Sequence, residues 1–330
     1  MTANILITRH DKIGDFVVSV PMFKILKQQR PELILYALVS KVNFEFASSI
    51  DFIDHVILYD KDNLQHTLSE IKQAKIDTSI SAFIDTQLAW LLFRAGIKQR
   101  IAPGTKIAQF LFNQRLTQRR SRVEKREFEY NLDLLAAFDS QLQLEYSQPL
   151  LTFPKSASDA VICAFRKEHQ LHSSDTIIAF HPGSGGSAEG NLSIDDYLLL
   201  AKSIVDHPRI KIVFTFGPDD QDLCQQLSEK LDFKAILYNS SGSLTNFCLL
   251  LSHFQLFVST STGTMHLAAA SNTATLTFFG ENRVSSPQRW ASVSASEQQH
   301  NVVLPAPYDR DQYQSIETQL LEILSCADTH

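Results

Sequence analysis

Short apolar runs rich in β-branched residues alternate with longer amphipathic runs along the chain. In the first half, short runs with the length and composition of buried strands are Ile5–Thr8, Ile34–Val39, Val56–Leu58 and Ser79–Ile84. Longer runs whose apolar spacing predicts helices are Phe16–Lys27, Leu64–Lys75, Gln87–Ala95 and Phe128–Phe138. Strands that alternate with helices predict βαβ units and therefore a parallel sheet.

The same alternation restarts after Gln148–Pro154, where two prolines disfavour helix and predict an extended linker. The expected elements of the second half are a helix at Ala157–His169 and strands at Ile177–Phe180, Ile210–Phe216, Ala235–Leu237, Leu256–Val258 and Thr275–Phe278. The pattern therefore predicts an α/β protein with two doubly wound domains, residues 1–150 and 151–330, facing a central cleft. Ligands of such domains bind at the carboxyl ends of the strands.

Two loops rich in glycine and hydroxyl residues follow predicted strands of the second domain. The first, which precedes a helix expected from about Ser193, contains His181, Gly183, Ser184, Gly185 and Gly186. The second, which leads into a helix with His266 in its first turns, contains Ser261, Thr262, Gly263 and Thr264. Glycine lets backbone N–H groups approach a phosphate, and a helix N-terminus adds partial positive charge, so together the loops predict a diphosphate site. Neither has the spacing of a known phosphate motif, and each alone is equally explained as a tight βα turn.

The first predicted strand leads into a turn that ends in Gly14 and Asp15. Gly14 allows a tight bend, and Asp15 then falls at the start of the following helix with its carboxylate toward the cleft. A carboxylate in that position is able to act as a general base. Asp is also a favoured N-cap residue, so helix capping is the alternative explanation.

Basic residues are concentrated in one part of the chain. The formal net charge is −6, but the segment from Arg94 to Arg126 holds ten basic residues and one acid, Glu124. Charge runs usually form a solvated helix face or a mobile loop. The alternative is a surface that binds an anionic partner.

Composition places the chain among ordinary globular proteins, since 330 residues that are 44% hydrophobic suffice for two cores. No window approaches the ~18 consecutive apolar residues of a membrane span, and the first residues lack the basic start of a signal peptide. We therefore expect a cytoplasmic protein. The four cysteines are widely spaced without a C-x-x-C pattern, so we expect reduced thiols, no disulfide and no zinc.

Three segments resemble one family, in the same order along the chain. ILITRHDKIGDFVVSVPMFKIL resembles the first strand, Arg-x-x-x-(Leu/Ile)-Gly-Asp turn and proline-containing helix of the ADP-heptose:lipopolysaccharide heptosyltransferase family. FHPGSGGSAEGNLSIDDYLLLA resembles the family's His-Pro-Gly loop and the helix after it. LLLSHFQLFVSTSTGTMHLAAASNTATLTFFG resembles its segment Asn-Asp-Ser/Thr-Gly-x-x-His-Leu-Ala-Ala-Ala. The matches span residues 5 to 280.

The resemblance implies the B-type glycosyltransferase fold of family nine, with two Rossmann-like domains. It implies an acceptor on the N-terminal domain, a nucleotide-sugar donor on the C-terminal domain, inversion at the anomeric carbon and no metal or other cofactor. On the family pattern Asp15 is the catalytic base. The implied donor-binding residues are His181, Gly183, Ser184, Gly185, Gly186, Ser261, Thr262, Gly263, Thr264 and His266. The expected acceptor-binding residues are Lys12 and Gly14 of the first turn, with Arg119, Arg120 and Arg122 of the basic segment.

The chain departs from the family pattern at two positions. Glu189 stands where the family usually has a basic residue matched to the diphosphate, and Ser261 stands where it often has Asp. A carboxylate is repelled by a diphosphate, so the first departure bears on donor identity and on activity. His181 and His266 either contact ligand or hold their loops, and Trp290 belongs either to the donor site or to the core.

The leading functional hypothesis is transfer of a heptose or related sugar, from ADP-heptose or another nucleotide diphosphate sugar, to a lipopolysaccharide core or other surface glycan. The expected partners are that donor and an anionic lipid-linked oligosaccharide at the inner face of the inner membrane, where the basic segment attaches the protein electrostatically; nucleic acid is not expected. The alternatives are a homologue that binds nucleotide-sugar or glycan without turnover, and a nucleotide-sugar epimerase or hydrolase of the same fold. The Gly14-Asp15 pair favours catalysis.

Overall fold

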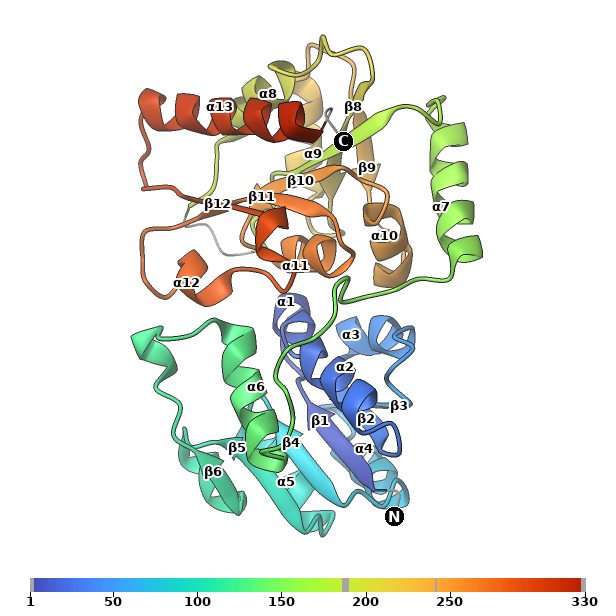
Figure 1. Ribbon diagram of the computed structural model, residues 1–330, viewed down its shortest axis with the longest axis vertical. Helices are drawn as coiled ribbons and strands as arrows, with labels where there is room; N and C mark the ends of the chain where they lie inside the picture. Colours follow the sequence, from blue (N-terminus) through green and yellow to red (C-terminus); the bar gives the residue numbers. More distant parts are fainter. Residues whose placement is uncertain (1–2, 186–189, 241, 328–330) are drawn as a thin grey trace. The chain divides into compact units, whose positions relative to one another are not determined.

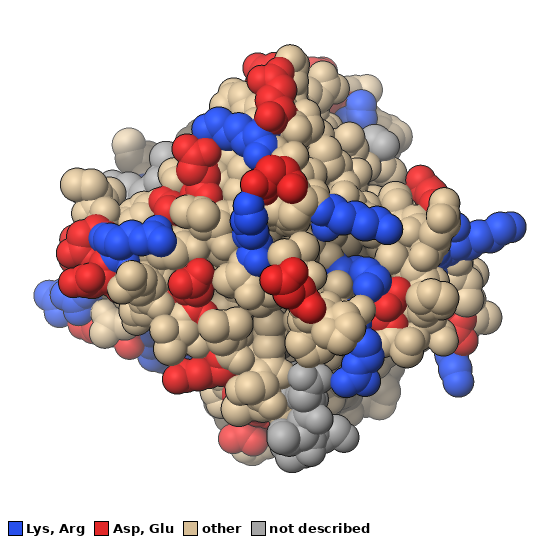
Figure 2. Space-filling view, turned by 90° about the horizontal axis from the view of Figure 1, so that it is seen from above, with Lys and Arg blue, Asp and Glu red and all other residues tan. Residues whose placement is uncertain are grey.

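The computed structural model describes residues 3–185, 190–240 and 242–327, which belong to two compact units, 1–150 and 151–330 (Figure 1). Each unit has its own parallel sheet with helices on both faces, so each is a Rossmann-like α/β domain and the α/β fold class is confirmed. Among the described helices, none combines the length and apolar character needed to span a bilayer. On the face shown in Figure 2, Lys and Arg side chains are interspersed with Asp and Glu.

The sheet of the N-terminal unit has the strand order β3-β2-β1-β4-β5-β6 in the residues described. The strands are β1 (Asn4–Thr8), β2 (Ile34–Val39), β3 (His55–Leu58), β4 (Thr78–Ser81), β5 (Gln99–Pro103) and β6 (Gln114–Leu116). All neighbouring pairs are parallel, and the central strand β1 places Thr8 between Leu38 of β2 and Ser81 of β4. The strand order reverses between β1 and β4, so the carboxyl end of β1 is the point at which ligands of such sheets bind.

Helices cover both faces of this sheet (Figure 1). One face carries α1 (Ile13–Val17), α2 (Val20–Gln29), α3 (Lys41–Ser48) and α6 (Glu127–Phe138), which contact one another in the pairs α1–α2, α1–α3 and α2–α6. The other face carries α4 (Leu64–Gln73), α5 (Thr86–Arg94) and the 3₁₀ helix η1 (Ile107–Leu111). Their apolar side chains form one buried cluster with Leu6 and Leu38 of the sheet. A second 3₁₀ helix, η2, spans Arg120–Arg122.

The helix starts differ in how they are capped. Asn63 caps α4 by accepting from the His66 N–H at 3.2 Å, and Asp85 caps α5 by accepting from the Leu88 N–H at 2.7 Å. By contrast, α1 begins after Lys12 without a side-chain cap. The single helix expected over residues 16–27 is in fact α1 and α2, since Pro21 near the start of α2 has no N–H to continue the ladder of α1.

The C-terminal unit repeats this architecture with the described strand order β12-β11-β10-β7-β8-β9, all parallel. Its strands are β7 (Thr176–His181), β8 (Ile210–Phe216), β9 (Ile236–Asn239), β10 (Leu256–Thr260), β11 (Ala274–Phe279) and β12 (Gln299–Val303). Its helices are α7 (Lys155–Glu168), α8 (Ile194–Lys202), α9 (Gln221–Lys230), α10 (Leu244–Leu251), α11 (Gly263–Ala270), α12 (Pro287–Trp290), η3 (Ser296–Gln298) and α13 (Arg310–Ala327). A large core packs α8, α9 and α13 on one face, while α7, α10 and α11 lie together on the other.

The apolar pattern missed β5, β6 and β12. β6 and β12 lie at sheet edges, and β5 lies next to β6. These three strands carry polar residues, so they are not continuous apolar runs of the kind that buried parallel strands form. Because β5, η1, β6 and η2 all fall between Arg94 and Arg126, the basic segment is neither one helix face nor a structureless loop. Many of its cations are anchored, as when Arg100 Nε donates to the Leu111 carbonyl at 2.8 Å.

Gly190 offers a test of the C-terminal fold. Its φ is +73°, and a Cβ at this position would lie 2.2 Å from the backbone of Phe279 and of Gly280. We therefore predict that Gly190→Ala lowers the free energy of unfolding by about 2 kcal/mol or more. Chemical denaturation measures this loss, with Gly242→Ala as the control because a Cβ at Gly242 meets nothing within 4 Å. Equal stability of the two variants would contradict the close approach at Gly190.

Candidate active site

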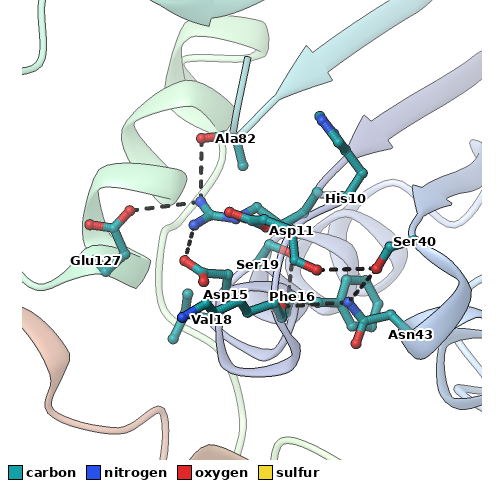
Figure 3. Close-up of polar contacts among 12 residues, drawn as sticks. His10, Asp11, Asp15, Phe16, Val18, Ser19, Ser40, Asn43, Ala82 and Glu127 are labelled. Carbon is teal, nitrogen blue, oxygen red and sulfur yellow. Dashed lines mark hydrogen bonds and ion pairs between the residues drawn. The ribbon is translucent and has the colours of Figure 1, made fainter. Parts of the chain in front are cut away.

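The turn between β1 and α1 is held rigidly at the carboxyl edge of the first sheet. Ser40 Oγ donates to the carbonyl of Asp11 at 3.1 Å, and the fully buried Asn43 donates to the carbonyl of Lys12 at 3.5 Å (Figure 3). Asp15 lies in the first turn of α1, but Lys12 is the N-cap residue and Asp15 does not cap the helix. The capping explanation for Asp15 is therefore wrong.

The carboxylate of Asp15 is bound to a buried cation. Arg9, whose side chain is 4% exposed, donates from Nη2 to Asp15 and from Nε to Asp11 at 2.8 Å. Its Nη1 donates to the carbonyl of Ala82 at 3.3 Å and lies 3.7 Å from Glu127 of α6. Figure 3 shows Asp15 and Glu127 pointing toward the same group from different helices. One guanidinium is thus shared by three carboxylates.

Two opposed effects set the acidity of Asp15. Burial raises the pKa of the Asp15 carboxyl, and the positive charge of Arg9 acts against that rise. The nearby charge of Asp11 raises the pKa further. The outcome is a raised pKa on a carboxylate that is still 18% exposed, which suits a group that accepts a proton during a reaction.

Arg120 does not project freely from the basic segment. Its guanidinium pairs with Glu127 and lies over the ring of Tyr130, and its Nη2 donates to Gln118 Oε1 at 2.8 Å. Its charge is therefore balanced within its own unit and helps to hold Glu127 beside Arg9. The other expected acceptor residues are placed variously: Lys12, Arg119 and Arg122 are exposed, while Gly14 is buried.

A second polar group adjoins this turn. His10, buried at the end of β1, is hydrogen-bonded through Nε2 to Asp85 at 2.8 Å, and its ring lies 4.3 Å from that of Tyr59. Burial acts to raise the pKa of Asp85, but hydrogen bonds from His10 and the Leu88 N–H lower it to about 2. This pair fixes the start of α5 against the turn that carries Arg9.

In the C-terminal unit, the loop after β7 is built around a buried histidine. His181 Nδ1 donates to the carbonyl of Thr215 at 2.9 Å, and its ring stacks on Phe257. Burial lowers the pKa of His181, and the charge of Asp220 opposes that change. Because His181 is tied to the neighbouring strand, it positions its loop.

Asp220 was not anticipated from the sequence. Its carboxylate accepts from the Gly217 N–H at 2.8 Å, and a Cβ at Gly183 would lie 2.7 Å from Oδ2 of Asp220. Glycine is therefore required at position 183 because the Asp220 carboxylate leaves no room for a side chain, independently of any ligand that the loop holds. A broader criterion, any polar loop directly after a predicted strand, would have found this loop after β8.

The helix α11 begins without a side-chain cap. The hydroxyls of Thr262 and Thr264 are hydrogen-bonded to each other at 2.8 Å, so neither satisfies the N–H groups of the first turn. Ser261, in contrast, lies one residue past the end of β10, and its N–H donates to the carbonyl of Phe278 in β11 at 3.0 Å. The Ser261 N–H is therefore not available to an anion. The N–H groups expected to bind an anion are those of the helix, from Gly263 onward.

His266 is buried within α11, three residues after Gly263. Burial lowers its pKa to about 4, and its Nδ1 has no hydrogen-bond partner among the described residues. Its ring faces Trp290, with 6.2 Å between the ring centroids. Of the remaining expected donor residues, Ser184 and Gly185 lie on the loop after β7, and Gly186 lies outside the described residues. Glu189, the departure from the family pattern, also lies outside them.

Two Rossmann-like domains, with the acidic turn on the first and the uncapped helix on the second, have the architecture of the B-type glycosyltransferase fold. Comparison with family models makes the class specific. Residues 67–319 match the model described as glycosyltransferase family 9 (heptosyltransferase), so the chain belongs to this family and is a glycosyltransferase. The family resemblance of the sequence motifs is thereby confirmed.

Individual relatives agree with this placement. A protein of Haemophilus influenzae (strain ATCC 51907 / DSM 11121 / KW20 / Rd) described as "Putative glycosyltransferase" is 38% identical over 298 residues, which is 88% of this chain and 86% of that protein. The solved structure of E. coli ADP-heptose LPS heptosyltransferase II has a TM-score of 0.81 at 18% identity and covers 99% of this chain and 100% of its own. That of E. coli heptosyltransferase WaaC with ADP has a TM-score of 0.71 at 16% identity, covering 97% and 99%. At these identities the two structures show a shared fold.

The buried His266 predicts a specific loss of stability in mild acid. An unfolded histidine has a pKa of about 6.5, whereas burial lowers that of His266 to about 4. Between these values only the unfolded chain takes up the proton, so stability falls as the pH falls from 7 to 5, by about 2 kcal/mol from this residue. Denaturant melts at both pH values should show that His266→Phe removes this part of the loss. His66→Phe, at an exposed histidine, is the control and should keep the pH dependence of the parent. An unchanged pH dependence in His266→Phe would contradict a neutral, buried His266.

Proposed function

We propose that this glycosyltransferase moves a heptose or related sugar from ADP-heptose to a lipopolysaccharide core or related surface glycan, with inversion. The observation that carries the proposal is the partly buried Asp15 carboxylate with a raised pKa, held by Arg9 at the carboxyl edge of the first sheet. The two E. coli heptosyltransferases support the donor, since one is described as acting with ADP-heptose and the other as solved with ADP. The proposed lipopolysaccharide acceptor is supported by the description of the first structure as an LPS heptosyltransferase.

In the proposed reaction Asp15 takes the proton of an acceptor hydroxyl while that oxygen bonds to the anomeric carbon of the donor. The bond from that carbon to the diphosphate oxygen breaks, and the nucleoside diphosphate leaves with the electron pair. Protonation of Asp15 removes one carboxylate from Arg9, but Asp11 and Glu127 remain beside the guanidinium. The buried cation therefore keeps partners throughout, which limits the cost of the proton transfer.

On the donor side, the N–H groups of Gly263 and Thr264 at the start of α11 are proposed to stabilise the leaving diphosphate. They carry the partial positive charge of a helix N-terminus and have no acceptor within the helix. The same groups supply charge stabilisation without a metal or other cofactor, in keeping with the family pattern. The remaining donor contacts are proposed to come from the loop that begins at His181.

The acceptor is proposed to be an anionic lipid-linked oligosaccharide reached at the cytoplasmic face of the inner membrane. Exposed Arg119 and Arg122 are its proposed contacts, whereas Arg120 acts through Glu127. A binder without turnover and an epimerase or hydrolase are the competing activities. Mass-spectrometric detection of ADP from ADP-heptose, with and without a core-oligosaccharide acceptor, separates three of these activities: transfer requires acceptor, hydrolysis does not, and a binder releases none. An epimerase also releases no net ADP, and is recognised by chromatographic separation of the isomeric ADP-sugar that it forms.

The role of Asp15 is tested by Asp15→Asn, which keeps the shape and removes the basicity. We expect kcat to fall roughly 10²-fold or more, the size of a general-base contribution, with little change in folding. Asp11→Asn is the matched control, because Asp11 also pairs with Arg9 but is not the proposed base. Near-normal turnover of Asp15→Asn, or an equal loss in both variants, would contradict the assignment.

The Thr264 hydroxyl is proposed to bind the diphosphate together with the N–H groups of α11. This contact is tested by Thr264→Val, which removes the hydroxyl at nearly constant volume. We expect ADP affinity, measured by calorimetry, to fall by roughly 3- to 10-fold, the size of one hydrogen bond. Thr318→Val is the control, since the Thr318 hydroxyl donates only to Gln314 within α13. Unchanged ADP affinity in Thr264→Val would show that the Thr264 hydroxyl does not contact the diphosphate, and only the N–H groups of α11 would remain as its proposed donors.

A further inference from the structure

Two adjacent helices of the N-terminal unit expose large apolar side chains. On α5, Trp90 and Phe93 are 49% and 48% exposed, and on η1, Ile107 and Phe110 are 85% and 73% exposed. Each pair is three residues apart, which places both members on one face of an α-helix and, still more closely, of a 3₁₀ helix. Because α5 and η1 pack against each other, we call these four side chains the α5–η1 patch.

A chain of contacts joins the patch. The rings of Trp90 and Phe93 meet edge to face at 5.9 Å, and the guanidinium of Arg100 lies 5.5 Å from the Phe93 ring. The same Arg100 donates to the carbonyl of Leu111 at the end of η1. The Phe110 ring in turn lies 5.7 Å from the guanidinium of Arg115. Exposed aromatic rings and arginines therefore alternate across both helices.

The surroundings of the patch on the chain are positive. From Thr86 to Val123 the sequence contains no Asp or Glu. Arg94, Lys98, Lys106 and Arg115 of this stretch are exposed. Aromatic and aliphatic side chains flanked by snorkelling cations are the composition of a surface that lies in the interface of a bilayer with anionic lipids.

The patch is also connected to the acidic turn. Lys106, the N-cap of η1, donates to the carbonyl of Ile84 at 3.0 Å and lies 4.1 Å from the ring of Phe83. The same ring lies 5.9 Å from the guanidinium of Arg9, which holds Asp15. A surface that anchored η1 would therefore lie beside the edge of the sheet at which Asp15 receives an acceptor.

We propose that the α5–η1 patch docks the protein on an anionic phospholipid bilayer, with the four apolar side chains in the headgroup region and the surrounding cations on the lipid phosphates. The purpose of this docking rests on the proposed function, in which a lipid-linked acceptor is presented to Asp15. Attachment through inserted aromatic side chains goes beyond purely electrostatic attraction by the basic segment. A second copy of the chain is a poorer occupant, because a two-fold contact would bring two carboxylate-free basic stretches together.

The chain contains a built-in reporter for the experiment. It has two tryptophans, so in Trp290→Phe the exposed Trp90 is the sole fluorescent tryptophan. Titration with phosphatidylcholine vesicles, with and without phosphatidylglycerol, should shift Trp90 emission to the blue, and brominated lipid should quench it, when the anionic lipid is present. The vesicles contain no glycan and no donor, so the result is independent of whether the transfer reaction is correctly assigned.

Two variants in the Trp290→Phe background separate the apolar contribution to vesicle binding from the electrostatic contribution. Ile107→Asp with Phe110→Asp should weaken binding to anionic vesicles about tenfold or more, since it removes apolar surface and adds repulsion. Lys98→Gln with Arg115→Gln should weaken it about tenfold at low salt and less at high salt. Val284→Asp with Leu321→Asp is the matched control, because these exposed apolar residues lie outside the patch, and it should bind like the parent.

Several results would overturn the proposal. Absence of any Trp90 shift or quenching at saturating anionic lipid would show that the patch does not enter the bilayer. Vesicle binding that survives Ile107→Asp with Phe110→Asp would place the contact elsewhere. Self-association in sedimentation that this double variant abolishes, without lipid binding by the parent, would identify a second copy as the occupant.

Discussion

The N-terminal site depends on one buried guanidinium. Arg9 sits at the end of the central strand β1, and its charge is too costly to bury unless carboxylates surround it. Asp11 and Asp15 come from the turn that follows, whereas Glu127 comes from α6 on the same face of the sheet. The ion pairs therefore fix the turn, the first helix and α6 to one another, and the charge of Arg9 opposes the rise in pKa that burial causes in Asp15.

The two units solve opposite electrostatic problems with the same topology. The first strand of the N-terminal sheet ends in a cluster with three carboxylates around a cation, which leaves acceptor oxygens for a proton. The strand β10 of the other sheet ends in a helix start whose N–H groups have no side-chain cap, which leaves donors for an anion. The same kind of βα connection thus presents carboxylate oxygens at the edge of one sheet and helix N–H groups without a side-chain cap at the edge of the other.

The sequence pattern predicted most of the fold because central parallel strands are buried on both faces and are therefore continuously apolar. It failed at β5, β6 and β12, where short strands at or near the sheet edges carry polar and charged side chains. The motifs likewise located Asp15 and the start of α11. They could not reveal that Glu127 shares Arg9 with Asp15, because a partner more than a hundred residues away leaves no local signal. Nor could they reveal that Ser261, one residue past the end of β10, donates its N–H to Phe278 of β11.

The contact between Gly183 and Asp220 links the evolution of two loops. Asp220 holds the turn after β8 through the Gly217 N–H, and its carboxylate occupies the space that any side chain at position 183 would need. A larger residue at 183 is therefore compatible with the fold only if the residue at 220 is smaller or its side chain points elsewhere. Either change removes the hydrogen bond to the N–H at position 217. Substitutions at these three positions are coupled, and their effects will be strongly non-additive.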